Sequence, residues 1–216
     1  MIRLATAFLL SMTACKVGTP TNATAEAPKT PVAAAPLAPG QAEAVFAAGC
    51  FWCIESDFEK VPGVIDAVSG YAGGFKDNPT YRQVGLGVTG HTEAIRVIYD
   101  PNTVQYAELL DYFWHHVDPF DGGGQFCDRG SQYRPAIFPG NDLERAAAEA
   151  SKTALETTFK TPTAVEIITL GTFWVAEDYH QDFYKTNPDH YKRYRLGCGR
   201  DARVKAIWDK VGSSGH

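Results

Sequence analysis

The chain has 216 residues, of which 44% are hydrophobic and 12% are aromatic. This content can build the core of one sizeable domain with an appendage, or of two small domains. The formal net charge of -5 creates no positive field for nucleic acid, so we exclude a nucleic-acid partner. No apolar run approaches the ~20 residues that a membrane-spanning helix needs.

The first 15 residues have the order of a short secretory signal. A positive start at residues 1–3 precedes an apolar stretch at 4–12, and the small residues Thr13 and Ala14 lead to Cys15. This order resembles a bacterial lipoprotein box, in which the cysteine becomes the acylated first residue of the mature chain. We therefore expect export to the cell envelope or periplasm, with a lipid anchor on Cys15. An ordinary secretory signal with a chance cysteine is the alternative.

Residues 16–40 have a composition that does not favour folding. Alanine, proline and threonine dominate this segment, and it contains no aromatic residue. Such a segment cannot bury enough apolar surface to offset the entropy that it loses on ordering. We expect a disordered linker over residues 16–40 and a folded domain over residues 41–212.

Hydrophobic periodicity predicts strands that alternate with helices in the folded domain. The predicted strands cover residues 45–48, 64–71, 92–99, 133–138 and 165–170. The predicted helices cover residues 54–61, 106–117 and 142–159, the last with Asn141 as its N-cap. Pro135 places the fourth strand at an edge or in an irregular segment. The irregular spacing excludes a doubly wound sheet and predicts an α+β fold, a layered sandwich with a ferredoxin-like core and a mixed sheet.

The predicted strand at residues 92–99 carries a carboxylate in an unusual place. In an extended chain Glu93 shares one face with Ile95, Val97 and Tyr99. A solvated carboxylate on an edge strand is the structural interpretation. The mostly apolar face favours a functional one.

The segment from Gly49 to Cys53 carries the clearest chemistry. If a helix begins just after Cys50, its thiol faces unpaired backbone N–H groups and the positive end of the helix dipole. Both would favour the reactive thiolate, so we expect a lowered pKa for Cys50. Phe51 and Trp52 add an apolar surface that suits a soft, thioether-like group.

Four other interpretations of these cysteines remain open at this point. Cys50 and Cys53 can be buried packing residues, or the active pair of a thioredoxin-like thiol–disulfide oxidoreductase. They can also be half of a zinc site completed by Cys127, Cys198 or a histidine, although no second closely spaced pair supports it. In an exported protein the cysteines can further form structural disulfides.

Five motifs in this order resemble the A class of peptide methionine sulfoxide reductases, and the resemblance covers nearly all of residues 45–200. The motifs are Gly49-Cys50-Phe51-Trp52, Gly70-Tyr71-Ala72-Gly73-Gly74, Asn78-Pro79-Thr80-Tyr81, Gly90-His91-Thr92-Glu93-Ala94 and Asp128-Arg129-Gly130-Ser131-Gln132-Tyr133-Arg134. The resemblance implies an enzyme that reduces methionine S-sulfoxide, free or in oxidised proteins, to methionine. It implies neither a bound cofactor nor a metal, and it implies an external dithiol such as thioredoxin as reductant.

The resemblance also assigns roles to individual residues. Cys50 corresponds to the nucleophile, and Phe51 and Trp52 correspond to the residues that line the pocket for the substrate methyl group. Glu93 corresponds to the acid that protonates the sulfoxide oxygen. A sulfoxide oxygen is a poor leaving group until it is protonated, and a carboxyl among aromatic rings holds its proton near neutral pH.

Further residues complete the implied site. Tyr81 and Tyr133 match the tyrosines that hydrogen-bond the sulfoxide oxygen, although on their own both can be core aromatics. Asp128 matches an acidic residue of the same site, with a turn-forming role as the alternative.

Attack by Cys50 would leave a sulfenic acid, which a second thiol converts to a disulfide. Cys198 resembles the carboxy-terminal resolving cysteine of many members, and its flanking glycines predict a mobile tail. We expect Cys198 to resolve first. Cys53, about one helical turn from Cys50, is the competing candidate. Cys127 stands where many relatives have asparagine, and no role follows for it from the sequence.

Overall fold

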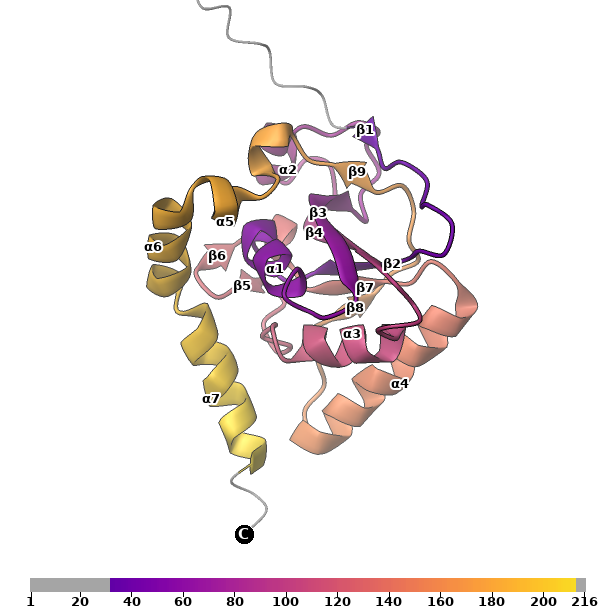
Figure 1. Cartoon of the computed structure of the whole chain (residues 1–216). Helices are drawn as coiled ribbons and strands as arrows, with labels where there is room; N and C mark the ends of the chain where they lie inside the picture. Colours follow the sequence, from indigo (N-terminus) through magenta and orange to yellow (C-terminus); the bar gives the residue numbers. More distant parts are fainter. Residues whose placement is uncertain (1–31, 213–216) are drawn as a thin grey trace, which may run out of the picture.

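The computed structural model describes residues 32–212 (Figure 1). The predicted signal at residues 1–15, the predicted lipid attachment at Cys15 and most of the expected linker lie outside the described residues. Among the described helices, none combines the length and the apolar character needed to cross a membrane. The helices and strands are, in chain order, β1 Val32–Ala33, β2 Ala42–Ala47, α1 Phe51–Phe58, β3 Val64–Ala72, α2 Tyr81–Gly85, β4 Thr92–Tyr99, α3 Tyr106–Trp114, β5 Gly124–Gln125, β6 Asp128–Arg129, η1 Ser131–Tyr133, β7 Ala136–Phe138, α4 Asp142–Phe159, β8 Glu166–Ile167, β9 Trp174–Val175, η2 Asp178–His180, α5 Phe183–Thr186, α6 Pro188–Cys198 and α7 Arg200–Gly212.

The described strands form a mixed seven-stranded sheet and a separate two-stranded sheet. The large sheet has the order β1-β9-β3-β4-β2-β7-β8, and β5 pairs with β6 in the small one. Neighbouring strands of the large sheet are antiparallel except β7 and β8, which are parallel. This arrangement confirms the predicted α+β fold with a mixed sheet and helices layered on it.

The long elements match their predicted positions, whereas the short ones differ. β4 and α4 have the predicted bounds, and the Asn141 side chain caps α4 by accepting a hydrogen bond from the backbone N–H of Glu144. α1 begins at Phe51, three residues before the predicted start. The predicted strand at 133–138 begins only at Ala136, because Pro135 cannot donate a hydrogen bond to a neighbouring strand.

One face of the sheet carries the larger part of the core, under α1 and α3. Phe46 of β2 is fully buried, and its ring stacks on Phe58 of α1 and Phe113 of α3 at centroid distances of 5.3 and 5.2 Å. Ile95 and Val97 of β4 belong to the same cluster. The alternation predicted for residues 92–99 is therefore correct, and it turns Glu93 toward this side of the sheet.

The end of the expected linker contacts the fold instead of remaining apart from it. Val32 and Ala33 pair with Val175 and Trp174 at the sheet edge. The Arg96 guanidinium donates a hydrogen bond of 2.8 Å to the carbonyl of Ala35. Residues 32–40 are thus tied to the domain, because backbone pairing and a buried cation offset the low hydrophobicity of this segment.

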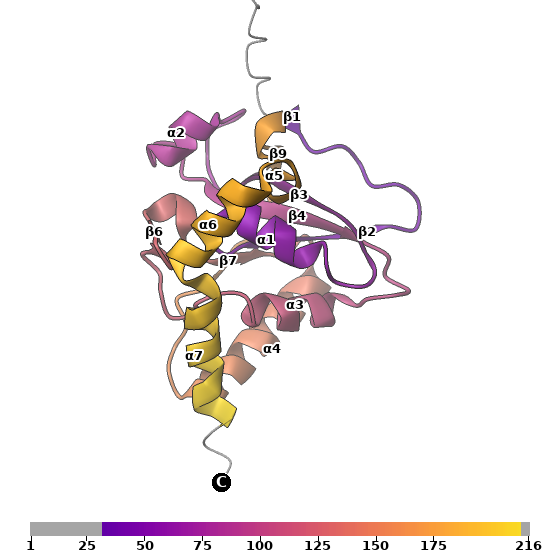
Figure 2. The ribbon, with the colours of Figure 1, turned by 60° about the vertical axis from the view of Figure 1, so that its left-hand side comes forward.

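The carboxy-terminal segment is held in place by a buried carboxylate. Asp57 of α1 has a side chain only 3% exposed, and it lies 2.8 Å from Nη1 of Arg195 and 3.9 Å from Nε of Arg200. These arginines lie in α6 and at the start of α7, on either side of Cys198. Figures 1 and 2 show the helices α6 and α7 following one another at the edge of the fold. The prediction of a mobile tail around Cys198 is therefore wrong, because ion pairs on both sides of it fix the backbone.

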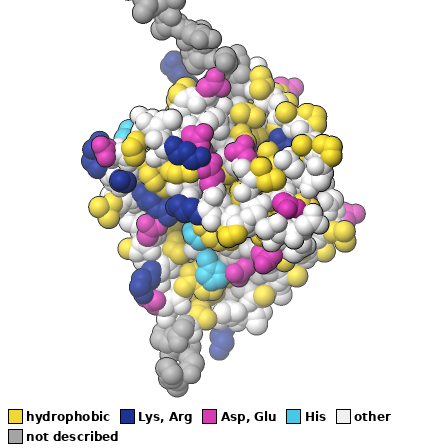
Figure 3. All heavy atoms as spheres, in the orientation of Figure 1, with side chains coloured by type: hydrophobic (Ala, Val, Ile, Leu, Met, Phe, Trp, Pro, Cys, Tyr) yellow, Lys and Arg dark blue, Asp and Glu magenta, His cyan; other side chains and the backbone are white. Residues whose placement is uncertain are grey.

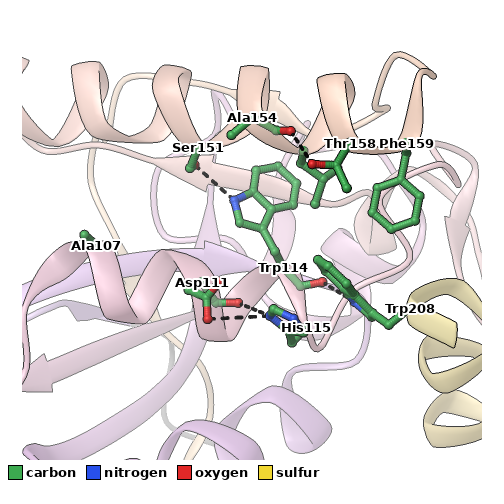
Figure 4. A pocket seen from close by; sticks show the side chains of 10 residues that line it. Ala107, Asp111, Trp114, His115, Ser151, Ala154, Thr158, Phe159 and Trp208 are labelled. Atoms are coloured by element: carbon green, nitrogen blue, oxygen red, sulfur yellow. Dashed lines mark hydrogen bonds and ion pairs between the residues drawn. The ribbon is translucent and has the colours of Figure 1, made fainter. Parts of the chain in front are cut away.

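The helix α7 reaches back to α3 through aromatic side chains (Figure 4). Trp208 stacks on His115 at 3.8 Å, and its indole N–H donates to the carbonyl of Trp114 at 3.3 Å. The Trp114 indole N–H donates in turn to the hydroxyl of Ser151 in α4 at 3.0 Å. A mostly apolar hollow of about 350 Å³ lies between these helices.

On the solvent-facing side of the molecule, Lys and Arg side chains gather over α6 and α7, at the left of Figure 3.

The buried stack around Phe46 generates a stability prediction. Phe46→Ala should lower the free energy of unfolding by about 3–5 kcal/mol, because it removes a buried ring and leaves a cavity among aromatic neighbours. Urea denaturation followed by far-UV circular dichroism measures the change. Ile65→Ala is the matched control, since Ile65 is 54% exposed on β3 and surface changes stay within about 0.5 kcal/mol. Equal losses in both variants would contradict the core assignment.

Candidate active site

Cys50 lies at the amino-terminal end of α1, as its N-cap residue. Gly49 precedes it with φ of +83°, a left-handed conformation that favours glycine. A Cβ at position 49 would also lie only 2.5 Å from Cβ of Gln125. The glycine therefore permits the tight approach that delivers Cys50 to the start of the helix.

A small cavity of about 110 Å³ opens beside Cys50. It brings together all seven residues that the sequence predicts for the catalytic site and the substrate pocket, from five separate parts of the chain. One further residue, Tyr194, was not predicted. The lining residues are Cys50, Phe51, Trp52, Tyr81, Glu93, Asp128, Tyr133 and Tyr194.

Glu93 is buried, with 3% of its surface exposed. Its Oε2 accepts a hydrogen bond of 3.1 Å from the backbone N–H of Phe51, the first residue of α1. Burial raises the pKa of Glu93 to about 8, with a smaller contribution from the charge of Asp128, and the hydrogen bond from Phe51 opposes the rise. The carboxyl therefore holds its proton at neutral pH and can act as an acid.

The prediction of a lowered pKa for Cys50 is wrong in this structure. Burial raises the pKa of the Cys50 thiol, and the neighbouring Cys53 and Glu93 raise it further. The helix end does not compensate, because its first N–H donates to Glu93 and the Cys50 side chain makes no capping hydrogen bond. Cys50 is therefore a neutral thiol at rest. Tyr194 is the one neighbour that favours its thiolate, and the hydroxyl of Tyr194 already donates its proton to Asp128.

The aromatic wall of the cavity is held by contacts behind it. The Trp52 ring stacks on Phe183 at a centroid distance of 3.7 Å and an interplanar angle of 8°. Its indole N–H donates to Nδ1 of His180 at 3.1 Å. Burial lowers the pKa of His180 to about 4, so this histidine is neutral and accepts the hydrogen bond. The Trp52 ring is thus fixed by packing and by one directed polar contact.

Tyr81 reaches the cavity from the first position of α2. A buried carboxylate, Glu177, accepts hydrogen bonds from the backbone N–H of Tyr81 at 2.9 Å and from the hydroxyl of Tyr71 at 2.7 Å. Glu177 therefore links the start of α2 to β3. Burial raises the pKa of Tyr81 to about 12, so its phenol stays neutral.

Tyr133 ends the short helix η1, which is fastened to β4 next to Glu93. The Thr92 hydroxyl contacts the carbonyl oxygens of Gln132 and Arg134 at 2.8 and 3.2 Å. Burial raises the pKa of Tyr133, and the charge of Glu93 adds to the rise. Two neutral phenols, those of Tyr81 and Tyr133, therefore line the cavity together with the carboxyl of Glu93.

Asp128 and Tyr194 close the cavity on the side of the small sheet. The Tyr194 hydroxyl donates to Oδ2 of Asp128. Burial raises the pKa of Asp128, and the hydrogen bond from Tyr194 limits the rise. Tyr194 lies one helical turn before Cys198 on α6, a spacing that places both side chains on the same face. That spacing is the sequence signal that could have identified Tyr194.

The four cysteines within residues 32–212 separate into a reduced pair and a disulfide. Cys50 and Cys53 are free and buried. Cys127 and Cys198 form a disulfide across 71 positions of the chain, with their Cα atoms 4.9 Å apart. Neither Cys53 nor Cys198 lines the cavity as described, but Oδ2 of Asp128 is 3.9 Å from Sγ of Cys198. The pairing assigns Cys127 a partner that the sequence did not indicate.

The structure does not support the zinc interpretation. Cys127, Asp128 and Cys198 offer ligand atoms within 4.8 Å of one another, but the disulfide joins the two sulfurs, so no thiolate is available to a metal. Cys50 and Cys53 do not belong to this group. Across residues 32–212, the predicted pair and the other cysteines therefore form no common tetrahedral site.

Comparisons with known sequences agree with this geometry. The family model described as peptide methionine sulfoxide reductase matches residues 42–211. Peptide methionine sulfoxide reductase MsrA 2 of Caulobacter vibrioides is 51% identical over 172 residues, which cover 79% of this chain and 87% of the relative. The MsrA of Bacillus subtilis is 48% identical over 167 residues, which cover 76% of this chain and 94% of the relative.

Solved structures give the same result. Methionine sulfoxide reductase A of Corynebacterium diphtheriae has a TM-score of 0.63 and 35% identity, over 70% of this chain and 77% of that one. Reduced Mxr1 from Saccharomyces cerevisiae has a TM-score of 0.66 and 30% identity, over 69% of this chain and 87% of that one. The chain therefore belongs to the peptide methionine sulfoxide reductase family, and it is an oxidoreductase that acts on methionine sulfoxide.

Proposed function

We propose that this enzyme repairs oxidative damage by reducing the S epimer of methionine sulfoxide, free or in proteins, with Cys50 as nucleophile and Glu93 as acid. One observation carries the proposal: a thiol and a carboxyl that both hold their protons line the same aromatic cavity. The family resemblance supports the choice of the S epimer.

The first step balances in protons and electrons. Glu93 gives its proton to the sulfoxide oxygen as the Cys50 sulfur attacks the substrate sulfur, and the thiol proton returns to the Glu93 carboxylate. The oxygen then passes to Cys50: the S–O bond of the substrate and the transient bond between the two sulfurs break, and an S–O bond to Cys50 forms. Methionine leaves with its sulfur reduced, and Cys50 becomes a sulfenic acid. The acid is needed because an unprotonated sulfoxide oxygen leaves poorly.

The residues around Cys50 and Glu93 orient the substrate. Phe51 and Trp52 form the apolar surface against which the substrate methyl group packs, since sulfur and its methyl group pack well against aromatic rings. Tyr81 and Tyr133 donate hydrogen bonds to the sulfoxide oxygen without adding charge, because both phenols are neutral. Asp128 completes the polar side of the site and holds the Tyr194 hydroxyl, which in turn contacts the Cys50 thiol.

In the steps that follow, the oxidised state moves from Cys50 to the pair Cys127 and Cys198. Cys198 attacks the Cys50 sulfenic acid, which releases water and forms a Cys50–Cys198 disulfide. Cys127 next attacks Cys198, so that Cys50 returns to a thiol. The Cys127–Cys198 disulfide beside two reduced cysteines is the product state of this sequence. A thioredoxin-type dithiol reduces it, as the family resemblance implies. Cys53 competes for the first attack from its buried position next to Cys50.

Replacing the nucleophile tests the central claim. Cys50→Ser should abolish methionine formation from the S epimer, because serine at this position is far less nucleophilic than a thiol. High-performance liquid chromatography of the product, with each purified epimer and dithiothreitol, measures this. Cys53→Ser is the matched control and should still release methionine in its first turnover.

The opposite pattern, with methionine lost in Cys53→Ser and retained in Cys50→Ser, would refute the assignment. Mass spectrometry of the same quenched wild-type reaction identifies the resolving thiol. An unaltered Cys198 thiol after one turnover would reject Cys198 and favour Cys53.

Replacing the acid tests the proton transfer. Glu93→Gln keeps an oxygen that accepts the Phe51 hydrogen bond, yet it should slow the first turnover by about 10²–10⁴-fold. The ratio of wild-type to Glu93→Gln rates isolates Glu93, since Cys50 titrates in both proteins. Because the carboxyl is protonated only below its pKa, this ratio should fall as the pH rises through about 8. Rapid-quench measurements of both proteins between pH 6 and pH 10 give this ratio. A ratio that does not change with pH would contradict the role of Glu93 as an acid.

We further propose that the enzyme is exported and anchored by lipid on Cys15. The order of residues 1–15 supports this, and so does the proline- and alanine-rich segment that separates Cys15 from the domain. Cells grown with labelled palmitate should incorporate label into the wild-type protein and not into Cys15→Ala, as seen after immunoprecipitation. Equal labelling of both proteins, or no label in the wild type, rejects the anchor.

A further inference from the structure

The Cys127–Cys198 disulfide presents two unequal sulfurs to a molecule outside. Cys127 is exposed, and with Phe126 it forms the turn between β5 and β6. Cys198 is half-buried at the end of α6. An attacking thiolate must approach its target sulfur along the line of the S–S bond, so access decides which sulfur it reaches. Access favours Cys127.

The surroundings of the two sulfurs also differ in how well they accept negative charge. The backbone N–H of Cys127 points at Sγ of Cys198 at 3.2 Å, so a thiolate on Cys198 already has a hydrogen-bond donor. The Asp128 carboxylate does not separate the two sulfurs, because its oxygens lie 3.8 Å from Sγ of Cys127 and 3.9 Å from Sγ of Cys198. The N–H donor at Cys198 therefore makes Cys198 the better leaving group.

We propose that the external reductant attacks Sγ of Cys127 and that Cys198 leaves. This inference rests on the proposed function, and it makes Cys127 the entry point for electrons. The reductant belongs to the class of proteins with two neighbouring thiols. The turn suits such a partner, because Cys127 is exposed there.

The exchange proceeds in two steps that balance. A thiolate of the partner forms an S–S bond with Cys127 while the Cys127–Cys198 bond breaks, and Cys198 leaves as a thiolate with the electron pair. The second thiol of the partner then attacks its own neighbouring sulfur in the mixed disulfide. Cys127 leaves as a thiolate, and the partner carries away both oxidising equivalents as its own disulfide. Cys198 is free after the first step, on the helix that carries Tyr194 to the cavity.

Trapping the mixed disulfide tests the proposal. The probe is a thioredoxin in which the second active-site cysteine is replaced by serine, mixed with the full-length oxidised protein. Because the second step is blocked, the mixed disulfide accumulates, and mass spectrometry of its proteolytic digest locates the junction. We expect junctions at Cys127 in roughly tenfold excess over Cys198, because access to the sulfur and the quality of the leaving thiol both favour attack at Cys127. Equal junctions, or an excess at Cys198, overturn the proposal.

Two variants separate this result from the proposed function. Cys127→Ser should lose trapping at least roughly tenfold, whereas Cys53→Ser, which leaves the disulfide intact, should trap like the wild type. The experiment contains no sulfoxide, so Cys50→Ser with its disulfide formed by diamide should also trap at Cys127. If Cys50→Ser traps normally but still reduces sulfoxide, the proposed function fails alone. If the junctions lie elsewhere while Cys50→Ser is inactive, only the present proposal fails.

Discussion

One buried carboxylate, Asp57, holds the two ends of the site together. It faces two guanidinium groups, those of Arg195 and Arg200, from inside α1. Removal of one partner from such a buried pair typically costs about 3–5 kcal/mol, because a charge is left without compensation. These ion pairs hold α6 and the start of α7 against α1, the helix whose N-cap residue is Cys50. Tyr194 and Cys198 lie on α6 as well, so the ion pair of Arg195 holds the helix that carries both side chains.

Burial shifts the pKa values of the two groups that the proposed mechanism uses, Cys50 and Glu93, in the same direction. The lack of water that raises the pKa of Glu93 to about 8 also raises that of Cys50. A carboxyl needs this shift to be an acid at neutral pH, but a thiol becomes less ionised by it. The proposed mechanism reconciles the two requirements, since the Cys50 thiol proton would return to the Glu93 carboxylate after that carboxyl has protonated the substrate. A thiolate formed from a thiol of high pKa is also the stronger nucleophile.

Local sequence patterns predicted the parts of the structure that local forces determine. Alternating polarity located β4 and the face of Glu93, and the Asn141 cap located α4. The site residues followed from five motifs through family resemblance. The errors arose from distant contacts. The first N–H of α1 binds Glu93, 42 residues further along the chain, so it does not stabilise a Cys50 thiolate.

The prediction for Cys198 also failed because residues far away in the sequence hold it in place. Flanking glycines indicated a mobile segment, but Asp57, well over a hundred residues earlier, fixes it through the arginines on either side. The disulfide with Cys127 joins positions 71 residues apart, and no local spacing identifies such a pair.

The cavity beside Cys50 is small, about 110 Å³, and its size limits what can enter. It has room for the end of one side chain, so under the proposed function the rest of a polypeptide substrate would stay outside, and the residues on either side of the sulfoxide would add few contacts.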